Sequence, residues 1–390
     1  MSEQWIALLG RCDQPTDAVA DYCKFLSAAL CNLGIELQLD RCDWDVAGWA
    51  DAREALRERA ASWRGRRVLV QYTALAWSAR GFPVRFLSVL KLLRQCGARI
   101  AVVYHDAEPY SGGRLIDRFR RLAQLRTMRR ALRLADAAIL TVPADKLSWL
   151  RGKTPPNAVF IPVGANLPIA DPAAGIAPAN ANAIAAPARD AAKTVAVFGV
   201  TGGQAGRPEV LQIAAAVRFA AARLPLTQHS PAETAGAASL ADVPLRLVVL
   251  GRETETLAQP FENALRGSGV TVSVLGMLPG EDVVRTLRAA DVALFVRAAI
   301  SSRRSSAIAA IACGVPLIAW AGSETAPPIT EAGVVFYSRG EPDEPGRTLA
   351  RVLTDDPYRA ALAEQSRRAY AQHFSWSAIA RRYAAGLRRE

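Results

Sequence analysis

A run of polar side chains that could bind an anion extends from residue 301 to residue 306, between a buried-strand pattern and an apolar helix pattern. Serine hydroxyls, guanidinium groups and the unpaired N–H groups of a helix start all favour a diphosphate. In the alternative interpretation, the serines only cap the helix while both arginines face water. The members of this candidate anion site are Ser301, Ser302, Arg303, Arg304, Ser305 and Ser306.

A glycine-rich segment, Gly199 to Arg207, is a second candidate for phosphate binding. It follows the strand pattern Thr194–Phe198, and glycine allows a phosphate to approach backbone N–H groups closely. Arg207 is the basic side chain of this segment. A plain surface turn is the alternative interpretation.

Strand ends in the first half of the chain carry further reactive side chains. His105 and Asp106 follow the strand pattern Ile100–Tyr104, and Glu108 comes two residues later. Three other candidates lie at predicted strand ends: Gly10, Arg11 and Tyr72. A histidine at a strand end can also be purely structural, so both interpretations of His105 stay open.

Aliphatic runs separated by amphipathic stretches predict the elements that position these residues. The predicted strands of the first half are Trp5–Leu9, Ile35–Leu39, Arg67–Gln71, Ile100–Tyr104 and Ala137–Thr141. The predicted helices of that half are Asp17–Leu33, Ala50–Trp63, Pro83–Cys96 and Arg114–Leu134. In the second half, the predicted strands are Thr194–Phe198, Leu245–Leu250, Val270–Leu275, Val292–Val296 and Pro316–Ala319.

Strands that alternate with helices in this way predict parallel sheets covered on both faces. The sequence therefore predicts an α/β protein of two doubly wound Rossmann-like domains facing a cleft. The predicted divisions are an N-terminal domain 1–166, an Ala- and Pro-rich linker 167–192, a C-terminal domain 193–372 and a terminal helix 373–390. A second soft segment, 225–243, is predicted to be a surface loop.

Composition and missing motifs exclude several classes of protein. The chain has 390 residues, is 51% hydrophobic and has a formal charge of +12, which either indicates an anionic partner or reflects an Ala- and Arg-rich composition alone. No P-loop, dinucleotide fingerprint or nucleophile elbow occurs, and the six cysteines form no zinc-type pair. We expect no metal, no cofactor and no nucleic-acid partner. The first residues lack a signal-peptide pattern, so we expect a cytoplasmic protein.

Several segments, in order, resemble retaining glycosyltransferases of the GT-B fold, family 4. Ala290-Asp291-Val292 and the run Ala310 to Ala319, which contains Cys313-Gly314-Val315-Pro316, are similar to the donor-domain strand and helix of that family. Other matches are Gly10, the helix beginning near Asp17, Ile161-Pro162-Val163-Gly164, Leu250-Gly251, Val274-Leu275-Gly276 and His373-Phe374-Ser375-Trp376.

The resemblance implies a hexosyl-type transferase that moves a sugar from a nucleotide-sugar donor to a saccharide or lipid-linked saccharide. It further implies retention of anomeric configuration, metal independence and a role in cell-surface polysaccharide or glycan assembly. His105 and Asp106 would be catalytic, with His105 bonding the transferred sugar. Gly199, Arg207 and residues 301–306 would bind the donor, whereas Gly10, Arg11, Tyr72 and Glu108 would lie on the acceptor side.

One departure from the family pattern weakens this assignment. The family places two glutamates, separated by seven residues, where this chain has Ser301 and Ala309. Hydrogen bonds to a charged group contribute about 1.5–3 kcal/mol, so donor binding must be achieved differently. The alternative is a catalytically inactive, glycosyltransferase-like scaffold or nucleotide sensor. A nicotinamide or epimerase-type enzyme is a third alternative.

A basic helix is predicted between Arg114 and Arg133, where eight arginines accompany a single acidic residue, Asp117. Leucines, a phenylalanine and a methionine recur there at helical spacing: Leu115, Phe119, Leu122, Leu125, Met128 and Leu132. We expect this apolar stripe to pack on the core. The arginines would then be either solvated or in contact with the anionic inner face of a membrane, where each basic residue contributes about 1 kcal/mol.

Overall fold

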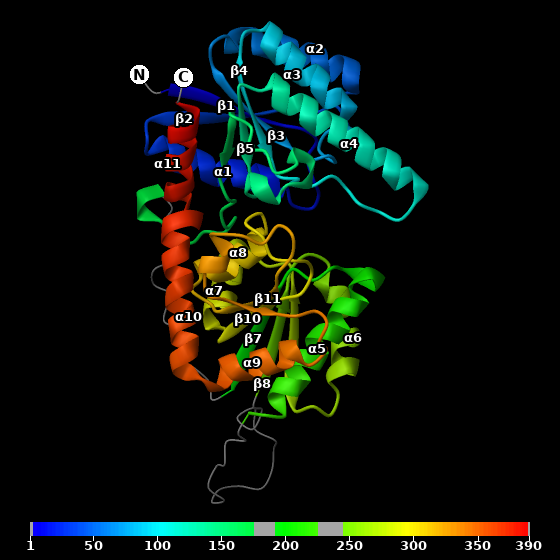
Figure 1. The fold of residues 1–390 in the computed structure, drawn as a ribbon, viewed down its shortest axis with the longest axis vertical. Coiled ribbons are helices and arrows are strands. Elements are labelled where there is room, and N and C mark those ends of the chain that lie inside the picture. Colours follow the sequence, from blue (N-terminus) through cyan, green and yellow to red (C-terminus); the bar gives the residue numbers. More distant parts are fainter. Residues whose placement is uncertain (1–2, 175–191, 225–244, 389–390) are drawn as a thin grey trace, which may run out of the picture. The chain divides into compact units, whose positions relative to one another are not determined.

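The computed structural model describes residues 3–174, 192–224 and 245–388, which form two compact units (Figure 1). Unit 1 comprises Met1–Asn166, Asp171–Ile176 and Ser375–Glu390, and unit 2 comprises Leu167–Ala170 and Ala177–Phe374. Most of the predicted linker 167–192, from residue 175 to residue 191, lies outside the described residues, as does the whole predicted loop 225–243.

Unit 1 contains a six-stranded parallel sheet in the order β2-β1-β3-β4-β5-β6. Its strands are β1 (Glu3–Leu9), β2 (Ile35–Arg41), β3 (Arg67–Tyr72), β4 (Arg99–Tyr104), β5 (Ala137–Leu140) and β6 (Ala158–Phe160). Its helices are α1 (Ala18–Cys31), α2 (Trp49–Ala60), α3 (Phe86–Gln95), α4 (Leu115–Leu134) and α11 (Trp376–Leu387). Aliphatic side chains are buried along these strands because helices cover the sheet.

Unit 2 contains a second six-stranded parallel sheet, in the order β12-β11-β10-β7-β8-β9. Its strands are β7 (Lys193–Phe198), β8 (Leu245–Leu250), β9 (Val270–Gly276), β10 (Val292–Phe295), β11 (Leu317–Trp320) and β12 (Val334–Tyr337). Its helices are α5 (Arg207–Ala221), α6 (Ala258–Leu265), α7 (Gly280–Ala289), α8 (Ser305–Ala312), α9 (Glu344–Thr354) and α10 (Asp356–Ala369). The predicted α/β class with two doubly wound Rossmann-like domains is confirmed, although β6 and β12 were not predicted.

The C-terminal helix α11 belongs to unit 1, where it packs against α1. The Trp376 ring stacks on Phe25 and meets Tyr22 edge-on, while its Nε1–H donates to the Ala165 carbonyl at 2.8 Å. A Cβ atom at Gly164 would lie 2.7 Å from the Trp376 ring. The glycine of the Ile161–Gly164 turn is therefore required by the close approach of this indole.

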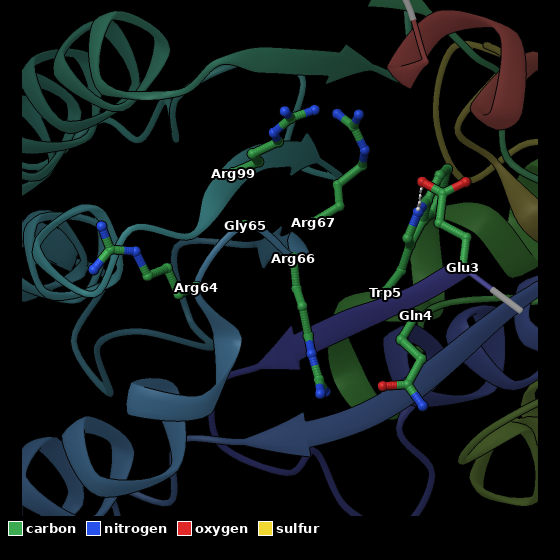
Figure 2. A pocket seen from close by; sticks show the side chains of 8 residues that line it. All are labelled: Glu3, Gln4, Trp5, Arg64, Gly65, Arg66, Arg67 and Arg99. Atoms are coloured by element: carbon green, nitrogen blue, oxygen red, sulfur yellow. Dashed lines mark hydrogen bonds between the residues drawn. The ribbon is translucent and has the colours of Figure 1, made fainter. Parts of the chain in front are cut away.

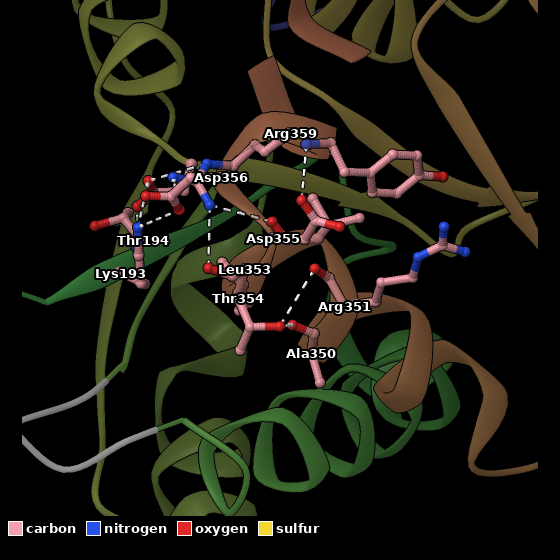
Figure 3. A network of polar contacts seen from close by, with 12 residues as sticks. Lys193, Thr194, Ala350, Arg351, Leu353, Thr354, Asp355, Asp356 and Arg359 are labelled. Carbon is pink, nitrogen blue, oxygen red and sulfur yellow. Dashed lines mark hydrogen bonds and ion pairs between the residues drawn. The ribbon is translucent and has the colours of Figure 1, made fainter. Parts of the chain in front are cut away.

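A partly buried network of polar contacts links β7, the residue before β10 and α10 in unit 2 (Figure 3). The Asp291 carboxylate accepts from the Thr194 backbone N–H at 2.8 Å and lies 3.7 Å from Arg359 Nε. Arg359 is only 8% exposed and also donates to the Leu353 carbonyl at 3.0 Å. The aspartate of the Ala290-Asp291-Val292 motif thus has a structural role in joining α10 to the sheet.

We expect Arg359→Ala to lower the free energy of unfolding by about 1–3 kcal/mol, because Asp291 would keep only Lys193, 3.9 Å away, as a cationic neighbour and the Val352 and Leu353 carbonyls would lose their donor. Asp356→Ala is the matched control, since Asp356 contacts the same guanidinium but is 69% exposed and should contribute little. Urea unfolding of both variants measures the difference. Equal destabilisation by the two substitutions would contradict this account of the network.

Candidate functional site

The strand order of unit 2 reverses between β7 and β10, which are neighbours although β8 and β9 separate them in sequence. In open α/β sheets, ligands bind beyond the carboxyl ends of the strands at such a reversal. Two loops meet there: the glycine-rich segment after β7 and the Ser/Arg segment before α8. A Cβ atom at Gly199 would lie 3.5 Å from Ser306 Oγ, so the two segments are in direct proximity.

The glycine-rich segment is held in a compact turn. Gly199 has a φ of +87°, a conformation that glycine adopts without strain. Thr201 donates from its backbone N–H and its hydroxyl to the Glu209 carboxylate, at 2.9 and 2.6 Å. Arg207 is exposed at the first position of α5. The turn therefore presents backbone near Ser306, with Arg207 at its far end.

The Ser/Arg segment is more buried than its composition suggests. Ser301 and Ser302 are 0% and 2% exposed, and the Ser301 hydroxyl donates to Glu324 Oε2 at 3.1 Å. Arg303 donates to both oxygens of Glu324, at 2.7 and 2.9 Å. Burial alone would raise the pKa of Glu324, but the hydrogen bond and charge of Arg303 outweigh it and lower the pKa. Arg303 and Glu324 therefore form a neutralised pair.

Sequence reasoning missed Glu324. The detectable signal was an acidic side chain in the loop after the predicted strand Pro316–Ala319, at the same sheet edge as Ser301. Nothing in the sequence identified Arg303 as its partner.

Arg304 differs from Arg303 because it forms no ion pair with a carboxylate among the described residues, although the charge of Glu324 acts on it from a distance. It is half-buried at the N-cap position of α8, and its Nε atom is buried without a hydrogen-bond partner in the described part of the chain. Burial, followed by the charges of Arg303 and Arg297, lowers the pKa of Arg304 to about 10, and the opposing charge of Glu324 does not outweigh them. The side chain stays charged at neutral pH. Together with half-buried Ser305 and Ser306 at the helix start, it forms a site suited to an anion.

The strand order of unit 1 reverses between β1 and β3, and a pocket of about 210 Å³ lies at that point. The predicted residues that line it are Gly10, Arg11 and Asp106, and Asp13, Asp17 and Thr73 line it as well. A Cβ atom at Gly10 would lie 2.2 Å from the Ala76 carbonyl oxygen, so only glycine fits there. The pocket combines a guanidinium with carboxylates, a surface suited to hydroxyl-rich ligands.

His105 is adjacent to this pocket, through Gln71, which also lines it. His105 Nε2 lies 2.8 Å from Gln71 Oε1, and Gln71 Nε2 donates to the Leu69 carbonyl at 3.2 Å. Because the Gln71 amide nitrogen donates to Leu69, its oxygen faces His105 and must accept a hydrogen bond. His105 Nε2 therefore carries the proton, and Nδ1 is left as a hydrogen-bond acceptor. Burial lowers the pKa of His105 to about 4, so the imidazole is neutral at physiological pH.

Two predicted acceptor-side residues occupy other surroundings. The Tyr72 ring is fully buried between Phe86 and Tyr104, so its side chain belongs to the core of unit 1. The Glu108 carboxylate accepts from the backbone N–H and the hydroxyl of Ser148, so it orders a loop. Neither side chain lines the 210 Å³ pocket.

A larger pocket, about 630 Å³, lies at the amino-terminal edge of the same sheet (Figure 2). Arg67 and Arg99 are register partners on β3 and β4, and Arg66 extends away from them as strand alternation requires. The Glu3 carboxylate at this edge accepts from Trp5 Nε1 and Arg388 Nε. Because ligands of open α/β sheets bind at the opposite edge, this pocket is not part of the candidate site.

The part of the chain that the structure describes contains neither a cluster of metal-ligand side chains nor a membrane-spanning helix. No group of three or more His, Cys, Asp and Glu side chains in residues 3–174, 192–224 and 245–388 could hold a metal ion. Among the helices described in the structure, none is both long and apolar enough to cross a membrane.

We expect His105 to titrate near pH 4 by NMR, and Gln71→Glu to raise its pKa by roughly one to three units, because a carboxylate at Nε2 stabilises the imidazolium. Gln71→Met is the neutral control and should leave the pKa low, since burial is the main cause. A wild-type His105 that titrates near 6.5 would contradict the buried, neutral state described above.

Comparisons with known proteins agree with this architecture. Residues 235–385 match a family model described as glycosyl transferase-like, which is less than half of the chain. No curated protein matches the sequence. The chain is similar in structure to Anabaena HepE in complex with UDP and glucose (TM-score 0.64, 13% identity, 99% of each chain covered).

Two other solved structures show the same similarity. One is a sucrose-phosphate synthase from Thermosynechococcus elongatus (TM-score 0.62, 17% identity, 99% of this chain and 98% of that one). The other is the N-terminal domain of a Candida albicans trehalose-6-phosphate phosphatase (TM-score 0.58, 12% identity, 99% of this chain and 97% of that one). At these identities the likeness concerns the fold, which is that of the two-domain GT-B proteins, with a glycosyl transferase-like match over residues 235–385.

Proposed function

We propose that the protein is a glycosyltransferase that moves a sugar from a nucleotide-sugar donor to a saccharide or lipid-linked saccharide acceptor. The observation that carries this proposal is the half-buried, charged Arg304, which has no carboxylate of its own at the β7–β10 reversal. The glycosyl transferase-like match over residues 235–385 supports it, because that segment contains Arg304 and α8. The fold of HepE, whose structure contains UDP and glucose, is consistent with it.

In this proposal, unit 2 binds the donor diphosphate. Arg304, the hydroxyls of Ser305 and Ser306, and the N–H groups at the start of α8 would stabilise the negative charge of the departing nucleoside diphosphate without a metal ion. Gly199 would leave room for a phosphate beside Ser306. Arg303 has a different role from Arg304: its ion pair with Glu324 orders the segment that presents Arg304.

Unit 1 would supply the groups that recognise hydroxyls. His105 Nδ1 would accept a hydrogen bond from a hydroxyl of the transferred sugar, with Gln71 fixing the tautomer. Asp106 and Arg11 would bind the acceptor at the 210 Å³ pocket. The family resemblance supports retention of configuration, hexosyl transfer and a role in polysaccharide or glycan assembly.

A catalytically inactive nucleotide sensor is the second candidate function. Ala309 is 1% exposed within α8, where the resembled family has a ribose-binding glutamate. Glu324 restores a carboxylate near Ser301, but Arg303 already pairs with it. Conversion of a nucleotide sugar to nucleoside diphosphate distinguishes the two functions, because a sensor would bind the nucleotide without turnover.

We expect one of UDP, GDP, dTDP and ADP, or its sugar, to raise the melting temperature of the wild type. Arg304→Ala should lower the affinity for that nucleotide at least about tenfold, because a charge-assisted hydrogen bond contributes roughly 1.5–3 kcal/mol. The control is the double variant Arg303→Ala with Glu324→Gln, which removes the ion pair without changing net charge and should weaken binding less.

The absence of any shift with millimolar nucleotide would contradict donor binding. A larger loss in the double variant than in Arg304→Ala would place the phosphate on Arg303 instead.

A further inference from the structure

The first half of α4 has its apolar side chains on the outside. Leu115, Ile116, Phe119 and Leu122 are 69%, 49%, 59% and 44% exposed. The expectation that the whole apolar stripe packs on the core is therefore wrong for this half. Only the later members follow it: Met128 is fully buried, and Leu125 and Leu132 pack against the core.

Polar side chains occupy the buried face of the helix and fix its rotation. The Asp117 carboxylate accepts from the Arg114 N–H at 3.0 Å and from Arg120 Nη1 at 2.7 Å. Gln124 donates to the Gly81 carbonyl at 2.9 Å and accepts from the Tyr110 N–H at 2.7 Å. The bonds of Asp117 stay within the helix, but turning α4 to bury its leucines would break the bonds of Gln124 to Gly81 and Tyr110 and the bond from Arg120 Nε to the Arg80 carbonyl, which would leave buried polar groups unsatisfied. The outward position of the apolar side chains is thus built into the fold.

The exposed charged side chains of α4 are all basic. Arg118 and Arg121 are exposed on the same half of the helix and Arg126 lies just beyond it, whereas Asp117, the one carboxylate of α4, is buried and paired. We define the α4 surface as Leu115, Ile116, Phe119, Leu122, Arg118, Arg121 and Arg126. Contiguous apolar exposure of this kind on a folded protein indicates an interaction site.

We propose that the α4 surface docks on an anionic lipid bilayer, with the helix lying in the interface and its apolar side chains inserted among the acyl chains. An interfacial helix needs an apolar face together with arginines that reach lipid phosphates, and this surface has both. A nucleic acid would satisfy the arginines but not the exposed leucines and phenylalanine. A second copy would bring like charges together, given the net charge of +12.

The inference deepens the acceptor side of the proposed function, since a lipid-linked acceptor lies at a membrane. It does not depend on the donor site in unit 2. A protein that binds a nucleotide but no vesicles would contradict this inference and leave the proposed function standing. A protein that binds vesicles but no nucleotide would contradict donor binding and leave this inference standing.

The test is co-sedimentation of the full chain with vesicles of phosphatidylcholine alone and of phosphatidylcholine mixed with phosphatidylglycerol. We expect binding only to the mixed vesicles, and weaker binding as salt increases. Leu115→Ser should weaken partitioning about tenfold, because an exposed leucine that enters the bilayer contributes much of its transfer free energy. Leu211→Ser in α5 is the matched control, since Leu211 is 65% exposed and lies in unit 2.

Equal binding to neutral and anionic vesicles, or equal effects of Leu115→Ser and Leu211→Ser, would overturn the proposal. A concentration-dependent dimer that Leu115→Ser abolishes would assign the surface to a second copy and overturn it as well, as would binding to duplex DNA in preference to the mixed vesicles. Both substitutions replace exposed side chains, so circular dichroism should show the same folded state for each.

Discussion

The reversal of strand order in each sheet is the constraint on which the candidate sites depend. Parallel strands place all their carboxyl ends on one edge, and at the reversal the connections on either side run in opposite directions, which leaves a crevice. In unit 2 this brings Gly199 beside Ser306, and in unit 1 it brings Gly10 beside Ala76. Asp291, the residue before β10, ties the two strands of the unit 2 reversal together, because its carboxylate accepts from the backbone N–H of Thr194 near the start of β7. Side chains far apart in sequence become neighbours there through backbone geometry alone.

Charge distribution then separates residues that look equivalent in the sequence. Arg303 and Arg304 are adjacent, yet only Arg303 is neutralised by Glu324. Arg304 is half-buried near Arg303 and Arg297, so its charge destabilises the unliganded protein, and a bound anion would relieve this destabilisation. In α4, likewise, the single carboxylate, Asp117, is buried and paired with Arg120, whereas Arg118, Arg121 and Arg126 are exposed. In both places the structure leaves cations at positions where a phosphate group of a ligand would be favourable.

Ten of the twelve strands could be predicted because each is an aliphatic run between helical patterns, whereas β6 has only three half-buried residues and β12, at the edge of its sheet, was missed. The Ser/Arg segment and Gly199 were candidates from their residue types and from the family resemblance, and the structure places Gly199 close to Ser306. Glu324 was not, because its contact with Arg303 spans 21 residues and depends on two neighbouring strand ends. The orientation of α4 was predicted wrongly because helical spacing cannot show that Gln124 finds partners at Gly81 and Tyr110, or that Asp117 is buried and paired within the helix.

Hydrogen exchange measured with and without the nucleotide that binds best is the most direct test of the central claim, that a nucleoside diphosphate binds at the β7–β10 reversal. The account predicts protection of backbone amides in the segments after Gly199 and around Ser305, with no change at the amino-terminal edge of the unit 1 sheet. Protection at that edge, or binding without protection of either unit 2 segment, would contradict it.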